Sequence, residues 1–412
     1  MKIPELLAPA GGMEALEAAL RFGADAVYGG MKRFGLRAFA GNFDAEALRE
    51  AAAKAHAAGK RFYVTMNVYP FDDELEDFAR CAREALEAGV DAAIVSDPGA
   101  IRLLRREAPW LPLHVSTQAS TVNTPAAELY AEMGCSRVIL AREVSLERIR
   151  WMHRNLGDRI ELETFVHGAS CMAYSGRCLL SAALTGRSGN RGECAQPCRW
   201  KYAVMEEKRP GEYLPVAEDG RGTYLFSAKD LCLMPLLPEL AEAGVASLKI
   251  EGRMKGEYYV AVVTGAYRRA LDLLRDGGRE AFDAALPGLL RELDAASHRE
   301  SDTGFLLGPP ETPGGAEGFR QEREYIARVV TGTDGSGLAR VQLKNRFFAG
   351  DPLELMTPEG VVPFRAESFT REKTGETLTT LGVAGEILRL RLPRCEAGDL
   401  IRGPVRNHRS QS

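Results

Sequence analysis

A recurring pattern of helical and apolar stretches organises the first 250 residues of the chain. In each copy, a stretch with helical periodicity ends at a glycine, and a short apolar run follows at once. A glycine at this point can close a helix in the left-handed conformation, and a short apolar run suits a strand that is buried on both faces. Each copy therefore predicts a helix, its cap and a parallel strand. The glycines of the clearest copies are Gly23, Gly89, Gly134 and Gly244, and Gly59 belongs to a looser copy.

Three further apolar runs bring the number of predicted parallel strands to eight. Helical stretches such as residues 44–58 and 73–88 separate successive runs, so the elements alternate in βα order. This order and this count predict an α/β fold, a (β/α)8 TIM-like barrel. An open, doubly wound sheet is the alternative, although the chain contains no G-x-G-x-x-G dinucleotide-binding loop. The three further runs lie at residues 5–8, 113–117 and 162–166.

The rest of the chain divides at a segment rich in glycine and proline. Seven of the eleven residues from 308 to 318 are Gly or Pro, which indicates a linker. Alternating runs beyond it predict a small C-terminal β-barrel domain. We therefore assign residues 1–300 to the barrel, 301–318 to the linker and 319–412 to the β domain. The seventh and eighth barrel strands are widely spaced, so a Cys-rich insertion lies between them, at residues 168–245.

Composition and charge indicate an ordinary globular protein. Of the 412 residues, 45% are hydrophobic and 27% charged, which argues against a disordered, collagen-like or coiled-coil protein. No apolar run approaches the roughly 18–20 residues of a membrane span, and Glu5 stands where a signal peptide would be apolar. We therefore expect a cytoplasmic protein with no membrane partner. The 53 basic and 57 acidic residues give a net charge of -4, so any binding of nucleic acid must use a local patch.

Two segments could supply such a patch. Residues 168–202 hold five cations against one anion, Glu193, with interleaved aromatic residues that could stack on unpaired bases. These cations could equally offset the negative charge of a thiolate-bound metal centre. In the C-terminal part, the strand face around Arg340, Lys344 and Arg346 has no acid close in the sequence. That face is either a solvated strand face or an RNA contact.

Four of the eight cysteines fall within 28 residues of the insertion. Cys171, Cys178, Cys194 and Cys198 form the pattern C-x6-C-x15-C-x3-C, in a segment rich in Gly, Ser, Asn and Pro. Zinc prefers thiolates in pairs of C-x2-4-C spacing, whereas iron–sulfur clusters suit wider and less regular spacing. The pattern favours an iron–sulfur cluster, with a zinc site and plain buried thiols as alternatives. There is no C-x3-C-x2-C motif, so S-adenosylmethionine radical chemistry is not indicated. Three of the other cysteines are interpreted as structural: Cys81, Cys135 and Cys395. The fourth, Cys232, is either a fifth ligand or a helix core residue.

Loops that follow the strands make the reactive face of a (β/α) barrel. Polar residues predicted in these loops are our candidates for catalysis, although each could instead be an ordinary loop or cap residue. A carboxylate or an imidazole among them could move a proton, and an arginine could bind a carboxylate through two parallel hydrogen bonds. The candidates are Arg37, Gln118, Arg142, Glu143, His167, Glu251 and Arg253, and Asn67 and Asp97 lie on the same predicted face.

Residues 163–200 resemble the signature of a known family. They read ETFVHGASCMAYSGRCLLS and then GRSGNRGECAQPCRW, which is similar to the collagenase-like peptidases of unknown catalytic type, peptidase family U32. The resemblance extends through ELLAPAGGMEALEAALRFGADAVYGG, HVSTQAS and SLKIEGRMK, and it covers most of the first 270 residues. The chain length and the compact insertion look most like the branch of this family that hydroxylates tRNA.

The resemblance implies a particular chemistry. It implies a [4Fe-4S] cluster held by Cys171, Cys178, Cys194 and Cys198, and an oxygen-independent conversion of the wobble uridine of tRNA to 5-hydroxyuridine. Prephenate is implied as the hydroxyl donor, and because it is a dicarboxylate, Arg142 or Arg253 would be a natural clamp for it. The implied partners are therefore tRNA and prephenate, with a paralogous subunit or a separate electron donor left open.

Two other classes of function remain as alternatives. The first is a hydrolase, either a collagenase-like peptidase or a glycosidase that uses Glu143 and Glu251 as its carboxylate pair. The sequence contains neither H-E-x-x-H nor G-x-S-x-G, which disfavours a peptidase. The second is a non-catalytic iron–sulfur protein that binds RNA, which predicts the basic insertion but no enclosed pocket at the barrel mouth.

Overall fold

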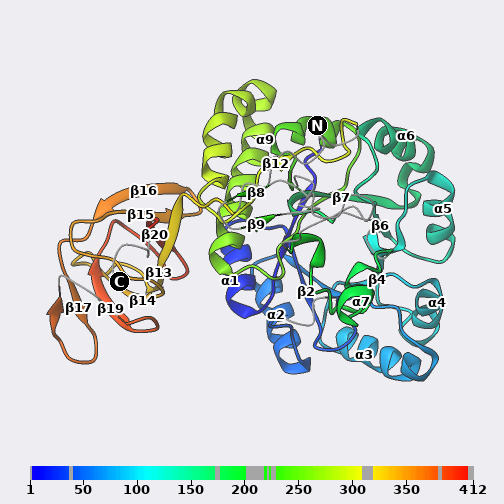
Figure 1. The fold of residues 1–412 in the computed structure, drawn as a ribbon, viewed down its shortest axis with the longest axis horizontal. Helices are drawn as coiled ribbons and strands as arrows, with labels where there is room; N and C mark the ends of the chain where they lie inside the picture. The colour runs from blue at the N-terminus through cyan, green and yellow to red at the C-terminus, as the bar shows by residue number, and fades with distance from the viewer. Residues whose placement is uncertain are drawn as a thin grey trace, which may run out of the picture.

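The computed structural model shows two parts, a barrel and a β domain, which lie side by side in Figure 1. The barrel is ringed by helices, and the strands of the β domain are coloured from yellow to red. Among the described residues, no helix is long and apolar enough to cross a membrane. The structure describes residues 2–36, 40–171, 177–200, 218–219, 222–223, 229–308, 319–378 and 383–406.

Eight parallel strands close into a barrel, which confirms the predicted fold. Each strand pairs in parallel with the next, and the last strand pairs with both the first and the seventh. The strands are short and their residues are almost all buried, as expected for strands covered on both faces. They are β1 (Glu5–Pro9), β2 (Ala26–Gly30), β3 (Arg61–Met66), β4 (Ala92–Val95), β5 (Leu113–Val115), β6 (Arg137–Ile139), β7 (Glu161–Ala169) and β11 (Ser247–Ile250).

Five helices of the barrel part end two residues before the predicted glycines, and several helices begin at a side-chain cap. Asp44, Asp97 and Ser145 each accept a backbone N–H at the start of a helix, which satisfies one of its free donors. The five glycines of the repeated pattern all have positive φ, between 68° and 93°, a region that glycine enters without steric cost. The helices are α1 (Met13–Arg21), α2 (Ala45–Ala57), α3 (Leu75–Glu87), α4 (Pro98–Glu107), α5 (Thr124–Glu132), α6 (Leu146–Leu156), α8 (Leu237–Glu242) and α9 (Glu257–Leu293), with single 3-10 turns at η1 (Asp72–Glu74), η2 (Thr117–Ala119), η3 (Gly157–Arg159) and η6 (Met234–Leu236).

The insertion lies between β7 and β11, as predicted. Its strand β10 (Asp230–Cys232) pairs antiparallel with the end of β7 and parallel with β12 (Ser301–Asp302), so it extends the barrel sheet on one side. Cys232 is therefore a buried strand residue, and the prediction that it could be a helix core residue is wrong. The remaining described elements of the insertion are α7 (Leu180–Thr185), η4 (Gly189–Arg191), η5 (Pro197–Arg199), β8 (Glu218–Asp219) and β9 (Gly222–Thr223).

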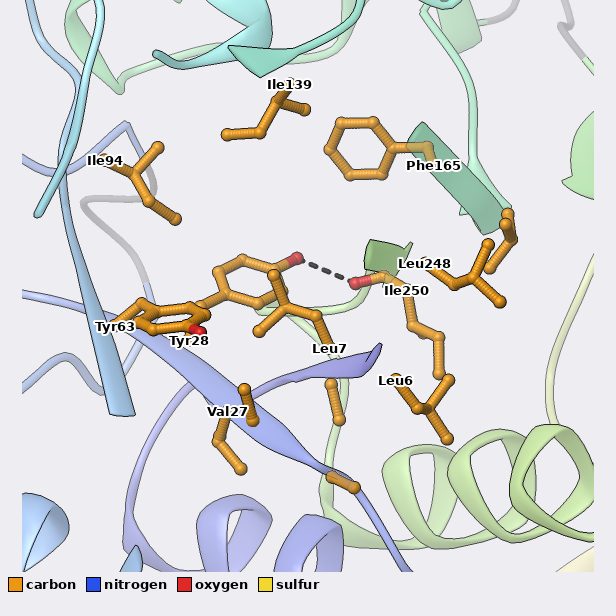
Figure 2. Close-up of a cluster of buried hydrophobic side chains, with 14 of the residues drawn as sticks. Leu6, Leu7, Val27, Tyr28, Tyr63, Ile94, Ile139, Phe165, Leu248 and Ile250 are labelled. Atoms are coloured by element: carbon orange, nitrogen blue, oxygen red, sulfur yellow. Dashed lines mark hydrogen bonds between the residues drawn. The ribbon is translucent and has the colours of Figure 1, made fainter. Parts of the chain in front are cut away.

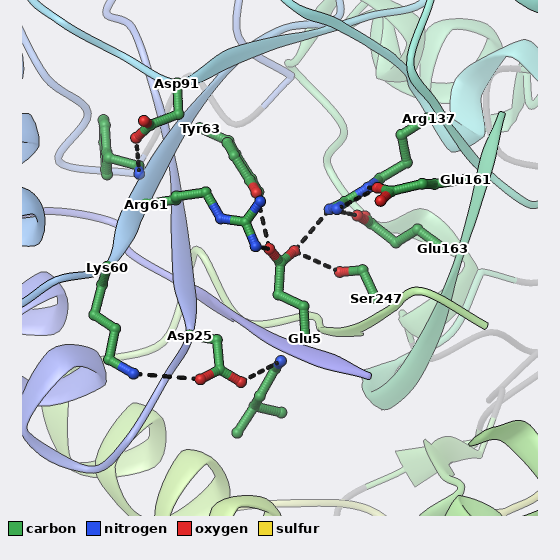
Figure 3. Close-up of polar contacts among 12 residues, drawn as sticks. Glu5, Asp25, Lys60, Arg61, Tyr63, Asp91, Arg137, Glu161, Glu163 and Ser247 are labelled. Carbon is green, nitrogen blue, oxygen red and sulfur yellow. Dashed lines mark hydrogen bonds and ion pairs between the residues drawn. The ribbon is translucent and has the colours of Figure 1, made fainter. Parts of the chain in front are cut away.

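The interior of the barrel has an apolar part and a charged part. Figure 2 shows buried apolar side chains of the barrel strands, some of which point toward the helices, and among them Tyr28 donates a hydrogen bond of 2.8 Å to the backbone oxygen of Ile250. The charged part uses the first residues of several strands. Figure 3 shows the carboxylate of Glu5 at its centre, contacted by Arg61, Tyr63, Arg137 and Ser247.

Arg137 carries most of this charged cluster. Its guanidinium lies 2.7 Å from Glu5, 2.7 Å from Glu161 and 3.1 Å from Glu163. Glu163 also accepts a 2.9 Å hydrogen bond from Lys249, and burial lowers the pKa of that lysine. Residues of β1, β6, β7 and β11 can meet in this way only inside the cylinder, so charged groups fill the end of the barrel at which the strands begin.

The β domain is an antiparallel sheet of eight strands. The described pairings run in the order β16-β15-β20-β13-β14-β19-β17-β18. Its own apolar core includes Ile326, Val341, Leu355 and Leu388. The strands are β13 (Arg323–Thr331), β14 (Leu338–Leu343), β15 (Pro352–Thr357), β16 (Gly360–Arg365), β17 (Phe369–Arg371), β18 (Thr377–Leu378), β19 (Ile387–Arg391) and β20 (Leu400–Pro404). The predicted linker overlaps residues 309–318, which lie outside the described residues, and the predicted domain boundaries remain predictions.

Ion pairs join the β domain to helices of the barrel. Glu257, at the start of α9, has a buried carboxylate that contacts Tyr325 at 2.6 Å, Lys344 at 3.1 Å and Arg328 at 3.3 Å. Further along α9, the carboxylate of Glu292 accepts two hydrogen bonds from Arg402, at 2.8 and 2.9 Å. Helix α9 therefore contacts both parts of the molecule.

In the structure, two of the three cations on the strand face around Arg340 pair with acids from distant parts of the chain. Arg340 makes two hydrogen bonds to Glu372, at 2.7 and 2.8 Å, and Lys344 contacts Glu14 and Glu257 of the barrel part. These acids are distant in the sequence, so a local reading of charge could not find them. The pairing leaves these two cations less available to phosphate groups.

Candidate functional site

The loops after the barrel strands, called the mouth below, bring several of the predicted residues together. Arg253 follows β11, and its side chain crosses to β3, where it donates a 2.8 Å hydrogen bond to the hydroxyl of Thr65. The guanidinium passes over β2, and a Cβ at Gly30 would overlap its Nη1. A glycine is therefore required at position 30 for this approach. Arg253 is only 5% exposed, so its charge is held inside the mouth.

Arg142 and Glu143 follow β6 on another side of the mouth. The Arg142 guanidinium carbon lies 4.2 Å from the centre of the Phe165 ring, which is the geometry of a cation–π contact. Glu143 is half-buried, and burial raises the pKa of its carboxyl against the opposing effect of Arg142. A carboxyl with a raised pKa is a stronger base once ionised, so Glu143 has the character expected of a group that moves a proton.

Three strands are tied together at the mouth by Asn67. The side-chain oxygen of Asn67 accepts the backbone N–H of Leu36 at 3.3 Å, and its amide nitrogen lies 3.4 Å from the hydroxyl of Ser116. Ser96 donates a hydrogen bond of 3.0 Å to the backbone oxygen of Asn67. Asn67 therefore fixes the loops after β3, β4 and β5 relative to one another, which is a positioning role.

The loop after β5 carries Gln118 in the 3-10 turn η2. Its backbone oxygen accepts a 2.7 Å hydrogen bond from Tyr69, whereas its side-chain oxygen is buried without a partner in the described part of the chain. Asp97 follows β4 and accepts the Ala100 N–H at 2.7 Å, so it serves as the cap of α4. Of these two candidates, only Gln118 has a buried side-chain atom without a partner among the described residues.

His167 lies on the helix side of β7. The pairing of β7 with β11 shifts register at Lys249 and Ile250, and the His167 ring contacts Tyr259 and Tyr267 of α9. Its Nδ1 lies 3.4 Å from the Tyr267 hydroxyl. Burial lowers the pKa of His167 to about 4, so the ring is uncharged at neutral pH.

The remaining two candidates give less information. Glu251 is half-buried after β11, and its backbone oxygen accepts a 3.0 Å hydrogen bond from Tyr259. Arg37 lies outside the described residues. The catalytic roles assigned to the mouth residues remain predictions.

The four insertion cysteines all have at least partial contact with solvent. Cys171 and Cys194 are exposed, and Cys178 and Cys198 are half-buried. Four thiols that can reach solvent are a suitable donor set for an iron–sulfur cluster or for zinc. Among the described residues, however, no group of three or more His, Cys, Asp or Glu side chains is arranged to hold a metal ion. The ligand set therefore remains a prediction.

The other four cysteines are buried, as predicted. Burial raises the pKa of the thiol in each of them, so they are poor nucleophiles and poor ligands at neutral pH. They are Cys81, Cys135, Cys232 and Cys395.

Arg191 anchors residues 177–200, called the cysteine segment below, to the loop after β3. Its guanidinium donates to the backbone oxygen of Tyr69 at 3.0 Å and to the carboxylate of Glu74 at 2.6 Å, and it lies 4.4 Å from the centre of the Phe71 ring. The hydrogen bond from Arg191 holds the pKa of the Glu74 carboxyl below its usual value. Gly192 makes the next contact, since a Cβ there would lie 2.9 Å from the backbone oxygen of Gly35.

Sequence reasoning missed this anchor because it treated Arg191 only as one cation of a basic patch. Thr65 and Phe165, which hold the mouth arginines, were also missed, since both belong to apolar strand runs. The only sequence signal for Arg191 was its place between two of the cysteines.

Strained backbone concentrates around the mouth and the cysteine segment. Among the described residues, four that are not glycine have positive φ, between 45° and 62°. Two lie in the loop after β2, one in the loop after β5 and one beside Cys194: Phe34, Asn42, Ser120 and Gln196. Such conformations cost about 1–3 kcal/mol each and cluster at functional sites. Their location supports the mouth as the functional end of the barrel.

Comparison with known proteins gives a consistent family. Residues 11–315 match the family model described as Peptidase family U32, and residues 321–402 match the model described as Peptidase family U32 C-terminal domain. The chain is 39% identical to the tRNA hydroxylation protein P of Escherichia coli over 91% of this chain and 90% of that one. It is 35% identical to the 23S rRNA 5-hydroxycytidine C2501 synthase of the same organism, over 90% of this chain and 55% of that one. It is also 30% identical to a protein of Porphyromonas gingivalis named collagenase, over 89% of this chain and 90% of that one.

Proposed function

The chain belongs to peptidase family U32, and within that family we propose that it is an enzyme that hydroxylates tRNA. The observation that carries this proposal is the 39% identity to the E. coli tRNA hydroxylation protein P, which spans both the barrel and the β domain. A relative named for hydroxylation of a ribosomal RNA base supports the same class of reaction.

In its specific form, the proposal is that the wobble uridine of tRNA becomes 5-hydroxyuridine without molecular oxygen, with prephenate as the hydroxyl donor. Replacement of hydrogen by hydroxyl at C5 of uracil requires that a proton leave that carbon, and it oxidises the base by two electrons. The step balances if the carbon of the donor keeps the electron pair of its broken C–O bond and takes up the proton, so that the donor is reduced by two electrons. Glu143 is the best-placed base among the candidates because it lies at the mouth, is half-buried and has a raised pKa. His167 is a weaker candidate, since its ring faces α9.

Two arginines could hold the carboxylates of prephenate. Arg253 is fixed by Thr65, and Arg142 lies against Phe165 with no ion pair among the described residues. A planar guanidinium binds a carboxylate through two parallel hydrogen bonds, and burial strengthens those bonds. These residues would orient the donor above the barrel, and the hydrogen-bonded loops around Asn67 would keep the site rigid.

The cofactor in this proposal is a [4Fe-4S] cluster, with Cys171, Cys178, Cys194 and Cys198 as ligands. When bound, such a cluster supplies electron transfer. The role of the chain is to present four accessible thiols and to place them, and Arg191 contributes by holding the cysteine segment at the loop after β3. A zinc site on the same residues is the alternative.

A hydrolase is the rival function, since one relative is named collagenase. The sequence lacks the H-E-x-x-H and G-x-S-x-G motifs that would supply a metal-bound water or an activated serine. A non-catalytic iron–sulfur protein that binds RNA is the second rival, and it differs from the proposal only in activity.

Nucleoside analysis of tRNA tests the function directly. Deletion of the gene should remove 5-hydroxyuridine and its derivatives from tRNA, and the wild-type gene should restore them. Unchanged nucleosides in a strain without a paralogue would refute tRNA hydroxylation. A strain that carries the Cys194→Ala variant separates the catalytic proposal from simple RNA binding, because a binding protein predicts no loss of the modified nucleoside.

Metal analysis tests the cofactor. Protein purified without oxygen should contain iron and sulfide and absorb visible light, and Cys194→Ala should lose that absorption. A colourless protein with stoichiometric zinc would refute the cluster while leaving the proposed reaction to be tested by nucleoside analysis.

A further inference from the structure

Arg142 is a partly buried arginine that forms no ion pair with the residues that the structure describes, although its charge acts on the neighbouring Glu143. Among the described residues it makes neither an ion pair nor a hydrogen bond, and its Nε is buried without a partner. Its guanidinium instead lies 4.2 Å from the centre of the Phe165 ring. Other buried arginines behave differently, since Arg137, Arg299 and Arg402 each contact at least one carboxylate.

A partly buried guanidinium is costly unless an anion or acceptor satisfies it. The neighbouring Glu143 does not fill this role, because no ion pair joins the two side chains in the described part of the chain. The guanidinium carbon lies over the Phe165 ring, and no carboxylate among the described residues forms an ion pair with its N–H groups. The geometry therefore presents an unused set of N–H donors at the mouth.

Two further buried polar atoms on the adjacent loop have no partner in the part of the chain that the structure describes. They are the side-chain oxygen of Gln118 and the hydroxyl of Thr121, which is 1% exposed. Buried polar atoms are nearly always hydrogen-bonded, so unsatisfied atoms on two neighbouring loops call for an explanation. Of the eleven such side-chain atoms among the described residues, three belong to Gln118, Thr121 and Arg142.

These residues are close because their loops are bonded to each other. Residues 116–121 follow β5 and residues 140–144 follow β6, and together they are called the β5–β6 corner below. Thr117 donates from its hydroxyl to the backbone oxygen of Leu140 at 3.1 Å, and the N–H of Ala141 donates to the backbone oxygen of Thr121 at 3.0 Å. Ser120, between the two orphan residues of the first loop, has a φ of 53°. The corner is thus fixed in a strained form, as binding sites often are.

We propose that Arg142, Gln118 and Thr121 form an oxyanion subsite at the β5–β6 corner. Arg142 would give two parallel hydrogen bonds to the oxyanion, and the Thr121 hydroxyl would give a third. The Gln118 oxygen is an acceptor, so the bound group carries a hydroxyl or N–H donor beside its oxyanion. A carboxylate of a small organic acid and a phosphate of RNA share this chemistry. The choice between these two sources rests on the proposed function, whereas the subsite itself rests on the unsatisfied atoms.

Binding measurements with two probes test the subsite and identify its source. Prephenate and unmodified tRNA would each be titrated against the full-length wild-type protein and against Arg142→Gln, Arg142→Lys and Thr121→Val. Arg148→Gln is the matched control, because Arg148 is an exposed arginine on α6 that makes no ion pair among the described residues. The thermal midpoint of each variant shows whether it is folded, and Thr121→Val, which keeps the shape of the side chain, remains informative if the arginine variants unfold.

A carboxylate source predicts that prephenate binding weakens about tenfold or more in Arg142→Gln and severalfold in Thr121→Val, with tRNA affinity unchanged. A phosphate source predicts that Arg142→Gln binds tRNA more weakly than wild type, with prephenate affinity unchanged. The dependence of tRNA affinity on salt concentration should also decrease by about one phosphate contact. In either case Arg142→Lys should bind more weakly than wild type, since lysine cannot form the two parallel bonds.

Equal affinities of wild type and all corner variants for both probes would overturn the subsite, and so would a wild-type protein that binds neither probe. These results are separate from those that test the proposed function. Loss of the subsite would leave nucleoside analysis of the deletion strain unaffected, and unchanged tRNA nucleosides would leave a measured oxyanion site in place.

Discussion

Arg191 fixes the cysteine segment to the barrel, and replacing it should loosen that segment by a predictable amount. In Arg191→Met the side chain keeps its apolar contact with Phe71 but loses the hydrogen bonds to Tyr69 and Glu74. Hydrogen bonds to charged groups are worth about 1.5–3 kcal/mol, and exposed cation–π contacts about 0.5–1 kcal/mol. The side chains of Arg191 and Glu74 are 30% and 28% exposed, so water screens the pair and the lower end of these ranges applies.

About 2 kcal/mol of local stability should therefore be lost, which corresponds to about a 30-fold rise in the open population of the segment. Hydrogen exchange measures this directly, because the backbone N–H groups of Arg191 and Glu193 both donate to the oxygen of Ser188 at 3.1 Å. Their protection should fall about 30-fold in Arg191→Met, with exchange in the barrel strands unchanged.

Two comparisons make this prediction strict. Arg148→Met removes an exposed arginine from α6 and should leave exchange in the cysteine segment unaltered. Glu74→Gln should reproduce part of the effect, and the double variant should show less than the sum of the two single losses because both changes break one interaction. Equal protection of the Arg191 and Glu193 amides in wild type and Arg191→Met would refute the anchoring role.

Three further predictions follow from the buried groups. The pKa of His167 is about 4 in the folded chain and about 6.5 in the unfolded chain, so protonation of the ring favours unfolding. The contribution of the neutral ring to the free energy of unfolding is therefore complete above pH 6.5 and is lost as the pH falls toward 4. Between pH 7 and pH 5 the free energy of unfolding should fall by about 2 kcal/mol in wild type, and chemical denaturation should show a smaller fall in His167→Asn. The same dependence on pH in both proteins would contradict a buried neutral ring. Arg137→Met should cost about 3–5 kcal/mol in the same assay, since it leaves Glu163 with a charge that Lys249 alone must balance, and a loss below about 1 kcal/mol would contradict a tightly coupled cluster. Gly30→Ala should push the guanidinium of Arg253 away from Thr65. Because the arginine side chain is flexible and can move, the thermal midpoint should change little, whereas tRNA modification should fall. Full activity would show that this placement of the arginine is not needed.

Much of the barrel was predictable because its signals are local. Helical periodicity, side-chain caps such as Asp44 and glycines such as Gly23 act within a few residues, so the order of helices and strands can be read along the chain. The charged cluster inside the barrel was not predictable, because Glu5 and Arg137 are 132 positions apart in runs that otherwise appear apolar. The acid that pairs with Arg340 was hidden for the same reason.

The candidate site was predictable only in outline. Placement after a strand identified Arg142, Glu143 and Arg253 as residues of the mouth, since every such loop lies at the same end of the barrel. The same rule could not predict the position of His167, because the pairing of β7 with β11 shifts register near this residue and the ring contacts α9. Nor could spacing alone determine how close the four insertion cysteines lie, because their separation depends on how the connecting loops fold.

The carboxylates that α9 offers to the β domain make the two halves of this molecule interdependent. A chain shortened after α9 would leave Glu257 buried with no counter-charge from Arg328 or Lys344, and would leave Glu292 without Arg402. The C-terminal part is therefore tied to the barrel rather than loosely attached, and although it has an apolar core of its own, its Met356 and Leu400 are buried in the core of the barrel part. Joining the C-terminal part to a different barrel would require acidic residues at matching positions on the helix that it contacts.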